Sequence, residues 1–131
     1  MIAVLVFPDF QLLDAAGPIS VFEIAACFAG QPPSIKVLAV TPGPVRSSSG
    51  VEMLARSLRP SGAITTLIVA GGEGVRTAAT CAKTLAFVQA AVARTQVALN
   101  ASVVEAMPPA AGIVAHRSGP LSSGIPAPST W

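Results

Sequence analysis

The chain has 131 residues, of which 52% are hydrophobic and only 11% charged, with eight Lys and Arg against six Asp and Glu. This length suits one compact domain, and the low charge indicates an incomplete domain or an oligomer. Gly and Pro interrupt the apolar runs before they reach the roughly 20 residues of a membrane span, and the basic residues are scattered along the sequence. We therefore expect a cytoplasmic protein with no direct contact to membrane or nucleic acid.

The first elements form a βαβ pattern. Residues 2–7 are a continuous apolar run, as in a central strand of a parallel sheet. A helix is predicted to begin at Gly17-Pro18, because Pro suits a first helical turn, and to end at Gly30. Residues 35–41 repeat the apolar strand pattern, so the first forty residues predict a strand, a crossover helix and a parallel strand.

The next elements continue the alternation. Residues 45–54 have no helical periodicity and predict two short extended pieces around a Ser-rich bend. A strand is predicted over 65–70, one long helix over 75–94 and a further strand over 96–101. The fold class is therefore α/β, with an open parallel sheet and helices on both faces.

Two regions differ in character. Residues 1–102 predict an incomplete α/β domain, and residues 103–131 predict an irregular tail rich in Pro and Gly. We expect no cofactor and no metal, because the glycine spacing of nucleotide-binding motifs is absent and Cys27 and Cys81 do not have metal-ligand spacing. Both cysteines are expected to be reduced and packed against helix neighbours.

Three loops follow the carboxyl ends of predicted strands and should lie on one rim, where open α/β sheets bind ligands: residues 9–17, residues 71–74, and residues from 101 onwards. We call this the rim. Asp14 is its candidate acid. Between apolar neighbours such an acid would lose solvation and could protonate a substrate or donate a hydrogen bond. The alternative is that Asp14 caps the helix predicted to begin at Pro18, or an adjacent turn.

Glycine and arginine supply the other candidate ligand-binding groups. Gly71, Gly72 and Gly74 lack a Cβ, so their backbone amides can approach an anion. Close packing of a strand-to-helix turn explains the same glycines equally well. Arg46, followed by Ser47–Ser49, could hold a carboxylate or phosphate, or could belong to a solvated turn.

Three motifs occur in order over residues 1–98: Phe7-Pro8-Asp9-Phe10 with Asp14, Gly17-Pro18 and Val21-Phe22-Glu23; Pro44-Val45-Arg46 with Ser47–Gly50; and Leu67 to Gly74 with Val75-Arg76. Together they resemble the PfpI-like (DJ-one/PfpI, class I glutamine amidotransferase-like) superfamily, and most closely the amino-terminal domain of GlxA-like AraC-family transcription regulators. The resemblance implies a flavodoxin-like, usually dimeric domain. It also implies an acid at Asp14 facing a Cys on a nucleophile elbow, with an oxyanion-binding turn at Gly72.

The sequence departs from that family at the elbow. Ala101 stands where the resemblance implies a Cys, and Ser102 is one residue out of register without a base to activate it. A frameshift in the gene or its sequencing is one hypothesis for the departure.

Three functions follow as hypotheses. The first is a non-catalytic sensing and dimerisation domain of an AraC-type regulator that lacks its helix-turn-helix half, able to bind a small molecule. The second is an isonitrile hydratase- or amidase-like enzyme, and the third is a protein-interaction pseudo-domain. The missing Cys favours the first.

Overall fold

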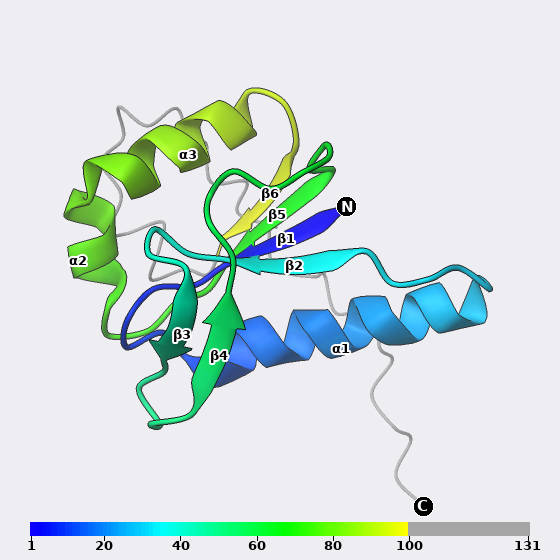
Figure 1. The fold of residues 1–131 in the computed structure, drawn as a ribbon, viewed down its shortest axis with the longest axis horizontal. Coiled ribbons are helices and arrows are strands. Elements are labelled where there is room, and N and C mark those ends of the chain that lie inside the picture. Colours follow the sequence, from blue (N-terminus) through cyan, green and yellow to red (C-terminus); the bar gives the residue numbers. More distant parts are fainter. Residues whose placement is uncertain (100–131) are drawn as a thin grey trace, which may run out of the picture.

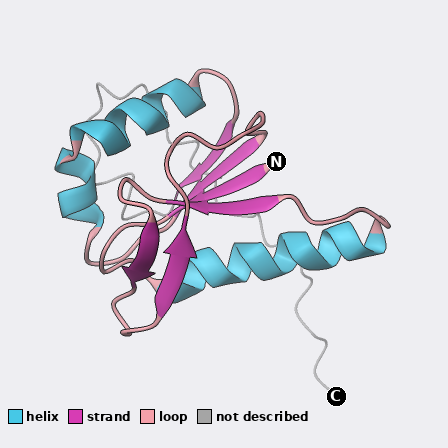
Figure 2. Ribbon diagram, in the orientation of Figure 1, coloured by secondary structure: helices cyan, strands magenta, loops and turns pink. Residues whose placement is uncertain are grey.

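The computed structural model describes residues 1–99, in which a parallel sheet lies between helices (Figures 1 and 2). The sheet consists of β1 (Ile2–Leu5), β2 (Ile35–Leu38), β5 (Thr66–Val69) and β6 (Gln96–Leu99) in the order β2-β1-β5-β6. Every neighbouring pair is parallel. The predicted α/β class and the central position of the first strand are confirmed.

The helices lie on opposite sides of this sheet (Figure 1). Helix α1 (Leu12–Phe28) packs against β1, β2 and β5, whereas α3 (Ala82–Val92) packs against β6. Because both faces of β1 are covered, the run from Ala3 to Val6 is almost fully buried. No helix within residues 1–99 is both long enough and apolar enough to cross a membrane.

A hairpin stands apart from the main sheet. Strands β3 (Gly43–Arg46) and β4 (Glu52–Ala55) pair antiparallel around the Ser-rich bend, as predicted. Two isolated bridges, from Phe10 to Ser47 and from Leu38 to Arg56, connect the hairpin to the rest of the domain. The first of these bridges places the hairpin beside the rim.

The predicted start of the first helix was wrong. Helix α1 begins at Leu12 and contains Pro18 within its length. Leu12, Ile19 and Phe22 all pack on the core, so burial of this face favours helix well before the proline. Pro18 has no backbone N–H, so the helix loses the hydrogen bond that residue 18 would otherwise donate to the Asp14 carbonyl. Asp14 therefore lies in the first turn of the helix, where an acid complements the helix dipole.

The single long helix predicted over residues 75–94 was also wrong. The structure has α2 (Val75–Thr80) and α3, separated by Cys81 in an extended conformation with ψ of 114°. The Thr80 hydroxyl donates to the Thr77 carbonyl at 2.9 Å, and Cys81 N–H donates to Ala78 O instead of continuing the helix. Such local side-chain bonds compete with the helical ladder.

The core makes a direct prediction about stability. Leu67 is fully buried in β5, whereas Leu54 is 76% exposed in β4. Leu67→Ala should lower the free energy of unfolding by about 2–5 kcal/mol, because it removes buried methyl groups and leaves a cavity. Leu54→Ala should change it by less than about 0.5 kcal/mol. Urea unfolding of both variants measures the difference, and equal losses would contradict the placement of β5 in the core.

Candidate functional site

The rim is built by direct contact between two of its three predicted loops. Gln11 N–H donates to Gly71 O at 2.7 Å, and Gly74 N–H donates to Asp9 O at 3.2 Å. Asp9 has a positive φ of 62°, which turns the chain sharply after β1. The bend at residues 9–11 and the turn at residues 71–74 thus form one continuous backbone surface beside the carboxyl ends of β1 and β5. The third predicted loop, from Ala101, lies outside the described residues.

Two glycines of the turn are required by close packing. At Gly72, with a φ of 122°, a Cβ would lie 2.5 Å from Gln11 N and 2.8 Å from Asp9 O. At Gly74 a Cβ would collide with the carbonyl oxygen of Pro8. The packing interpretation of these glycines is therefore correct, and it does not exclude ligand binding by the amides that the packing leaves exposed.

Asp14 connects helix α1 to the turn. Its Oδ2 accepts a hydrogen bond from Gly71 N–H at 3.0 Å, and the side chain is half-buried. A cap on a helix beginning at Pro18 was wrong, because α1 already begins at Leu12. A cap on an adjacent turn agrees with the bond from Gly71 N–H. The expected apolar wall is also incomplete, since Leu13 is 71% exposed. The carboxylate instead holds the turn against the helix with a charge-assisted bond.

Two backbone amides of the turn remain available. Among the described residues, Gly72 N–H and Glu73 N–H donate to no acceptor. Gly72 is half-buried and Glu73 is exposed, so a small group at the rim can reach both. Adjacent backbone amides of this kind bind anions and polarised carbonyl oxygens.

Arg46 lies beside the rim through its backbone. Its carbonyl accepts a hydrogen bond from Asp9 N–H at 2.9 Å. Its guanidinium lies over the Ser-rich bend, 3.4 Å from the position of a Cβ on Gly50. Ser47 is buried and shares a hydrogen bond of 2.9 Å with the hydroxyl of Ser49. The serines thus hold the bend internally, and the structure does not bring the Arg46 side chain onto Asp14.

The cysteines occupy different environments. Cys27 is exposed on α1, contrary to the expectation that it packs against neighbours, and both cysteines are free. The pKa of the half-buried Cys81 thiol lies below its usual value, mainly because Thr84 N–H donates to the sulfur and secondarily because the Thr84 hydroxyl does so. Within residues 1–99 no three His, Cys, Asp or Glu side chains are grouped to hold a metal ion.

No family model and no curated protein matches the sequence. A ThiJ/PfpI family protein from Pseudomonas syringae matches the structure with a TM-score of 0.61 and 29% identity, over 75% of this chain and 40% of that protein. A DJ-1 superfamily protein from Salmonella typhimurium matches with a TM-score of 0.65 and 24% identity, over 85% of this chain and 60% of that protein.

The described residues have a fold similar to that of ThiJ/PfpI and DJ-1 superfamily proteins. The chain spans between two fifths and three fifths of the length of these two solved proteins. An AraC family transcriptional regulator from Pseudomonas putida is also similar, with 19% identity over 54% of this chain and 46% of that one. The TM-score of this match is 0.49.

Sequence reasoning identified the residues of this PfpI-like rim but missed their main interaction. It placed Asp14 and Gly71 on one rim, yet it treated the acid as a cap or a free reactive group rather than the acceptor of the Gly71 amide. The helical stripe of Leu12, Ile19 and Phe22 was the available signal, because it carries the helix back past Asp14 and fixes the direction of the carboxylate.

The steric requirement at Gly72 leads to a prediction. Gly72→Ala should lower the free energy of unfolding by more than about 3 kcal/mol, because it adds backbone strain and a collision with the bend at residues 9–11. Gly62→Ala is the matched control, since Gly62 also has a positive φ, of 99°, but no atom lies within 4 Å of the place that its Cβ would take. Its loss should be about 1–2 kcal/mol. Equal losses in urea unfolding would show that the two loops do not pack as closely as described.

Proposed function

We propose that this PfpI-like domain is a non-catalytic sensing and dimerisation domain of an AraC-type transcriptional regulator, whose DNA contacts lie outside residues 1–99. The observation that supports it is the engagement of Asp14: its carboxylate accepts the Gly71 amide at 3.0 Å and so serves as a structural tie. The sequence has Ala101 at the elbow position, where an enzyme of this family would need its thiol. A rim with donors and without a nucleophile suits binding rather than turnover.

The small-molecule ligand would bind at the turn. Gly72 N–H and Glu73 N–H are the two donors that the described residues leave unused. They would bind a carboxylate or carbonyl oxygen, while Asp14 keeps the turn in place from the other side. Gly74 contributes by letting the turn approach the bend closely, and the Gly71 carbonyl contributes by accepting from Gln11 N–H. Arg46 would add long-range positive charge rather than a direct contact.

Helix α1 supports the dimerisation half of the proposal. Four large apolar side chains on it are strongly exposed: Leu13 at 71%, Val21 at 64%, Ile24 at 56% and Phe28 at 89%. At 100° per residue they fall within an arc of about 80°, and they extend over about 22 Å of the helix. The opposite side of the same helix packs on the core through Leu12, Ile19 and Phe22. A helix that is apolar on both sides is typical of one buried on both sides.

The exposed side of α1 fits a second copy of the same chain. It contains Gly17 and Ser20 between the large side chains, and the exposed Glu23 lies at its margin. In an antiparallel pair about a twofold axis, Leu13 would face Phe28 of the partner subunit, and Gly17 would face Ile24 of the partner subunit. These contacts are reciprocal, as an isologous interface requires, and a large residue then meets a small one near the centre. The pseudo-domain alternative uses the same surface for a different protein.

The dimer is tested by a charge on this surface. Ile24→Asp should convert a dimer to a monomer, because a carboxylate would be buried without a partner. Ala86→Asp, on the exposed side of α3, is the control with the same added charge and should remain dimeric. Sedimentation equilibrium at several concentrations measures both. A wild-type monomer, or dissociation by both substitutions, would contradict the α1 interface.

The proposed absence of catalysis can be tested with substrates of the alternative enzyme hypothesis, isonitriles and amides. We expect no hydration of a small isonitrile and no hydrolysis of a small amide above the rate in buffer, because no activated nucleophile is predicted. Product formation followed by chromatography is the measurement. Turnover that disappears in Cys27→Ser or Cys81→Ser would establish the enzyme hypothesis in place of the sensor.

A further inference from the structure

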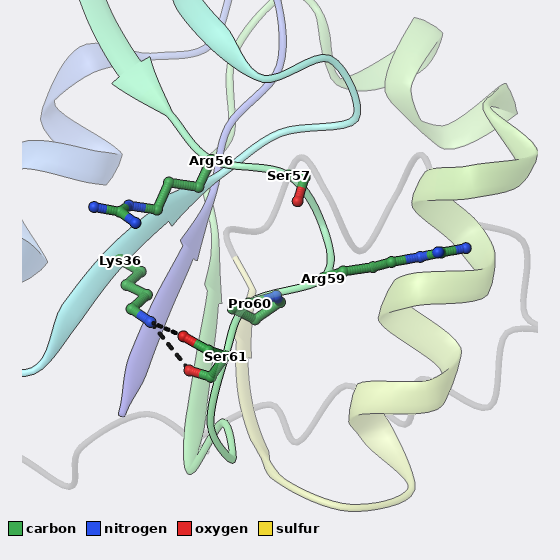
Figure 3. Close-up of a pocket in the computed structure, with 6 residues that line it drawn as sticks. All are labelled: Lys36, Arg56, Ser57, Arg59, Pro60 and Ser61. Atoms are coloured by element: carbon green, nitrogen blue, oxygen red, sulfur yellow. Dashed lines mark hydrogen bonds between the residues drawn. The ribbon is translucent and has the colours of Figure 1, made fainter.

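A second candidate site lies away from the rim. A hollow of about 280 Å³ is lined by Lys36 of β2 and by the segment that follows β4: Arg56, Ser57, Arg59, Pro60 and Ser61 (Figure 3). Three of the eight Lys and Arg residues of the chain therefore line one hollow. We call this the basic hollow. Its composition corrects the expectation that the basic residues are scattered.

Lys36 is fixed at the floor of the basic hollow. Its Nζ donates to the Ser61 carbonyl at 3.0 Å and to the Ser61 hydroxyl oxygen at 3.1 Å (Figure 3). An ammonium group has three donors, so one remains for a ligand. The Ser61 hydroxyl accepts from the lysine and keeps its own proton to donate. Two donors are thus positioned before any ligand binds.

Arg56 and Arg59 also line the basic hollow, and the side chains of both are exposed. Figure 3 shows Arg56 and Arg59 extending in opposite directions from the segment between them. The backbone of Arg56 is held firmly, because its N–H donates to Val37 O at 2.8 Å and its carbonyl accepts from Ala39 N–H at 2.9 Å. Within residues 1–99 neither arginine nor Lys36 forms an ion pair with a carboxylate. Their positive charges are therefore not neutralised by the described part of the chain.

We infer that the basic hollow binds a small molecule through a doubly charged oxyanion of the phosphate class. Such a group accepts hydrogen bonds on several oxygens at once, which matches the Lys36 ammonium and the serine hydroxyls at the floor. The two guanidinium groups can rotate onto the remaining oxygens, since their side chains are exposed. The volume of about 280 Å³ is just below that of ordinary ligand pockets and is large enough for such an anion.

The basic hollow is separate from the rim. Lys36 is the second residue of β2 and lies near the amino ends of the parallel strands, whereas Asp14 and Gly71 lie at their carboxyl ends. The inference does not depend on the proposed sensing function. A ligand could occupy either place without the other.

The test is titration of the full chain with inorganic phosphate, followed by amide chemical shifts in two-dimensional NMR at constant ionic strength. We expect saturable shifts centred on Lys36, Ser57 and Ser61. Lys36→Gln and Arg59→Gln should each weaken binding by about tenfold, the usual effect of losing a charge-assisted hydrogen bond. Arg76→Gln on α2 and Lys83→Gln on α3 are the controls with the same change in net charge, and should weaken it by less than about twofold.

Three results would overturn the inference. The first is no saturable shift with phosphate at tens of millimolar, and the second is equal weakening in the control variants, which would indicate general charge attraction. The third is a set of shifts confined to Gly72 and Glu73, which would move the anion to the rim. Circular dichroism of each variant confirms that a loss of binding is not a loss of fold.

Discussion

The rim depends on one close approach, between the bend at residues 9–11 and the turn at residues 71–74. Their contact is possible because Gly72 and Gly74 have no side chain at points where a Cβ would meet Gln11, Asp9 or Pro8. Once the loops touch, their polar backbone groups satisfy each other, as Gln11 with Gly71 and Gly74 with Asp9. The arrangement leaves the amides of Gly72 and Glu73 for a ligand, and it directs Gly71 toward the carboxylate of Asp14.

Asp14 connects this rim to the proposed dimer surface. It stands in the first turn of α1, one residue from the exposed Leu13 at the end of the apolar stripe. A movement of that turn would therefore change both the position of Gly71 and the surface offered to a second copy. In the proposed sensing function, this single helical turn would connect ligand binding to association. The basic hollow lies beside β2, and none of the residues that line it takes part in this connection.

Much of the fold was predictable from local sequence. The apolar runs of β1, β2 and β5 predicted a covered parallel sheet, and the Ser-rich bend predicted the hairpin, because burial on both faces and turn chemistry leave direct patterns. The helix boundaries were not predictable in the same way. Pro18 suggested a helix start, but the buried stripe that begins at Leu12 outweighed it, and the break at Cys81 depends on hydrogen bonds of Thr80 and Ala78 that no periodicity reveals.

The candidate site was predictable in its members but not in its interactions. Sequence order placed Asp14 and Gly71 on one rim, since the carboxyl ends of parallel strands meet there. The direction of the Asp14 side chain depends on the helical phase of α1, which required the correct helix start. The basic hollow could not be foreseen, because Lys36 and Ser61 are 25 positions apart and meet only through the path of the chain from β4 to β5.

The central claim is that the carboxylate of Asp14 holds the turn at residues 71–74 against α1. Native-state hydrogen exchange of the Gly71 amide tests it most directly, because this proton is the one that the carboxylate accepts. The account predicts slow exchange in the natural chain, and exchange faster by at least about tenfold in Asp14→Ala while the amides of β1 keep their protection. A Gly71 amide that already exchanges as fast as that of the exposed Gly62, or one unaffected by Asp14→Ala, would contradict it.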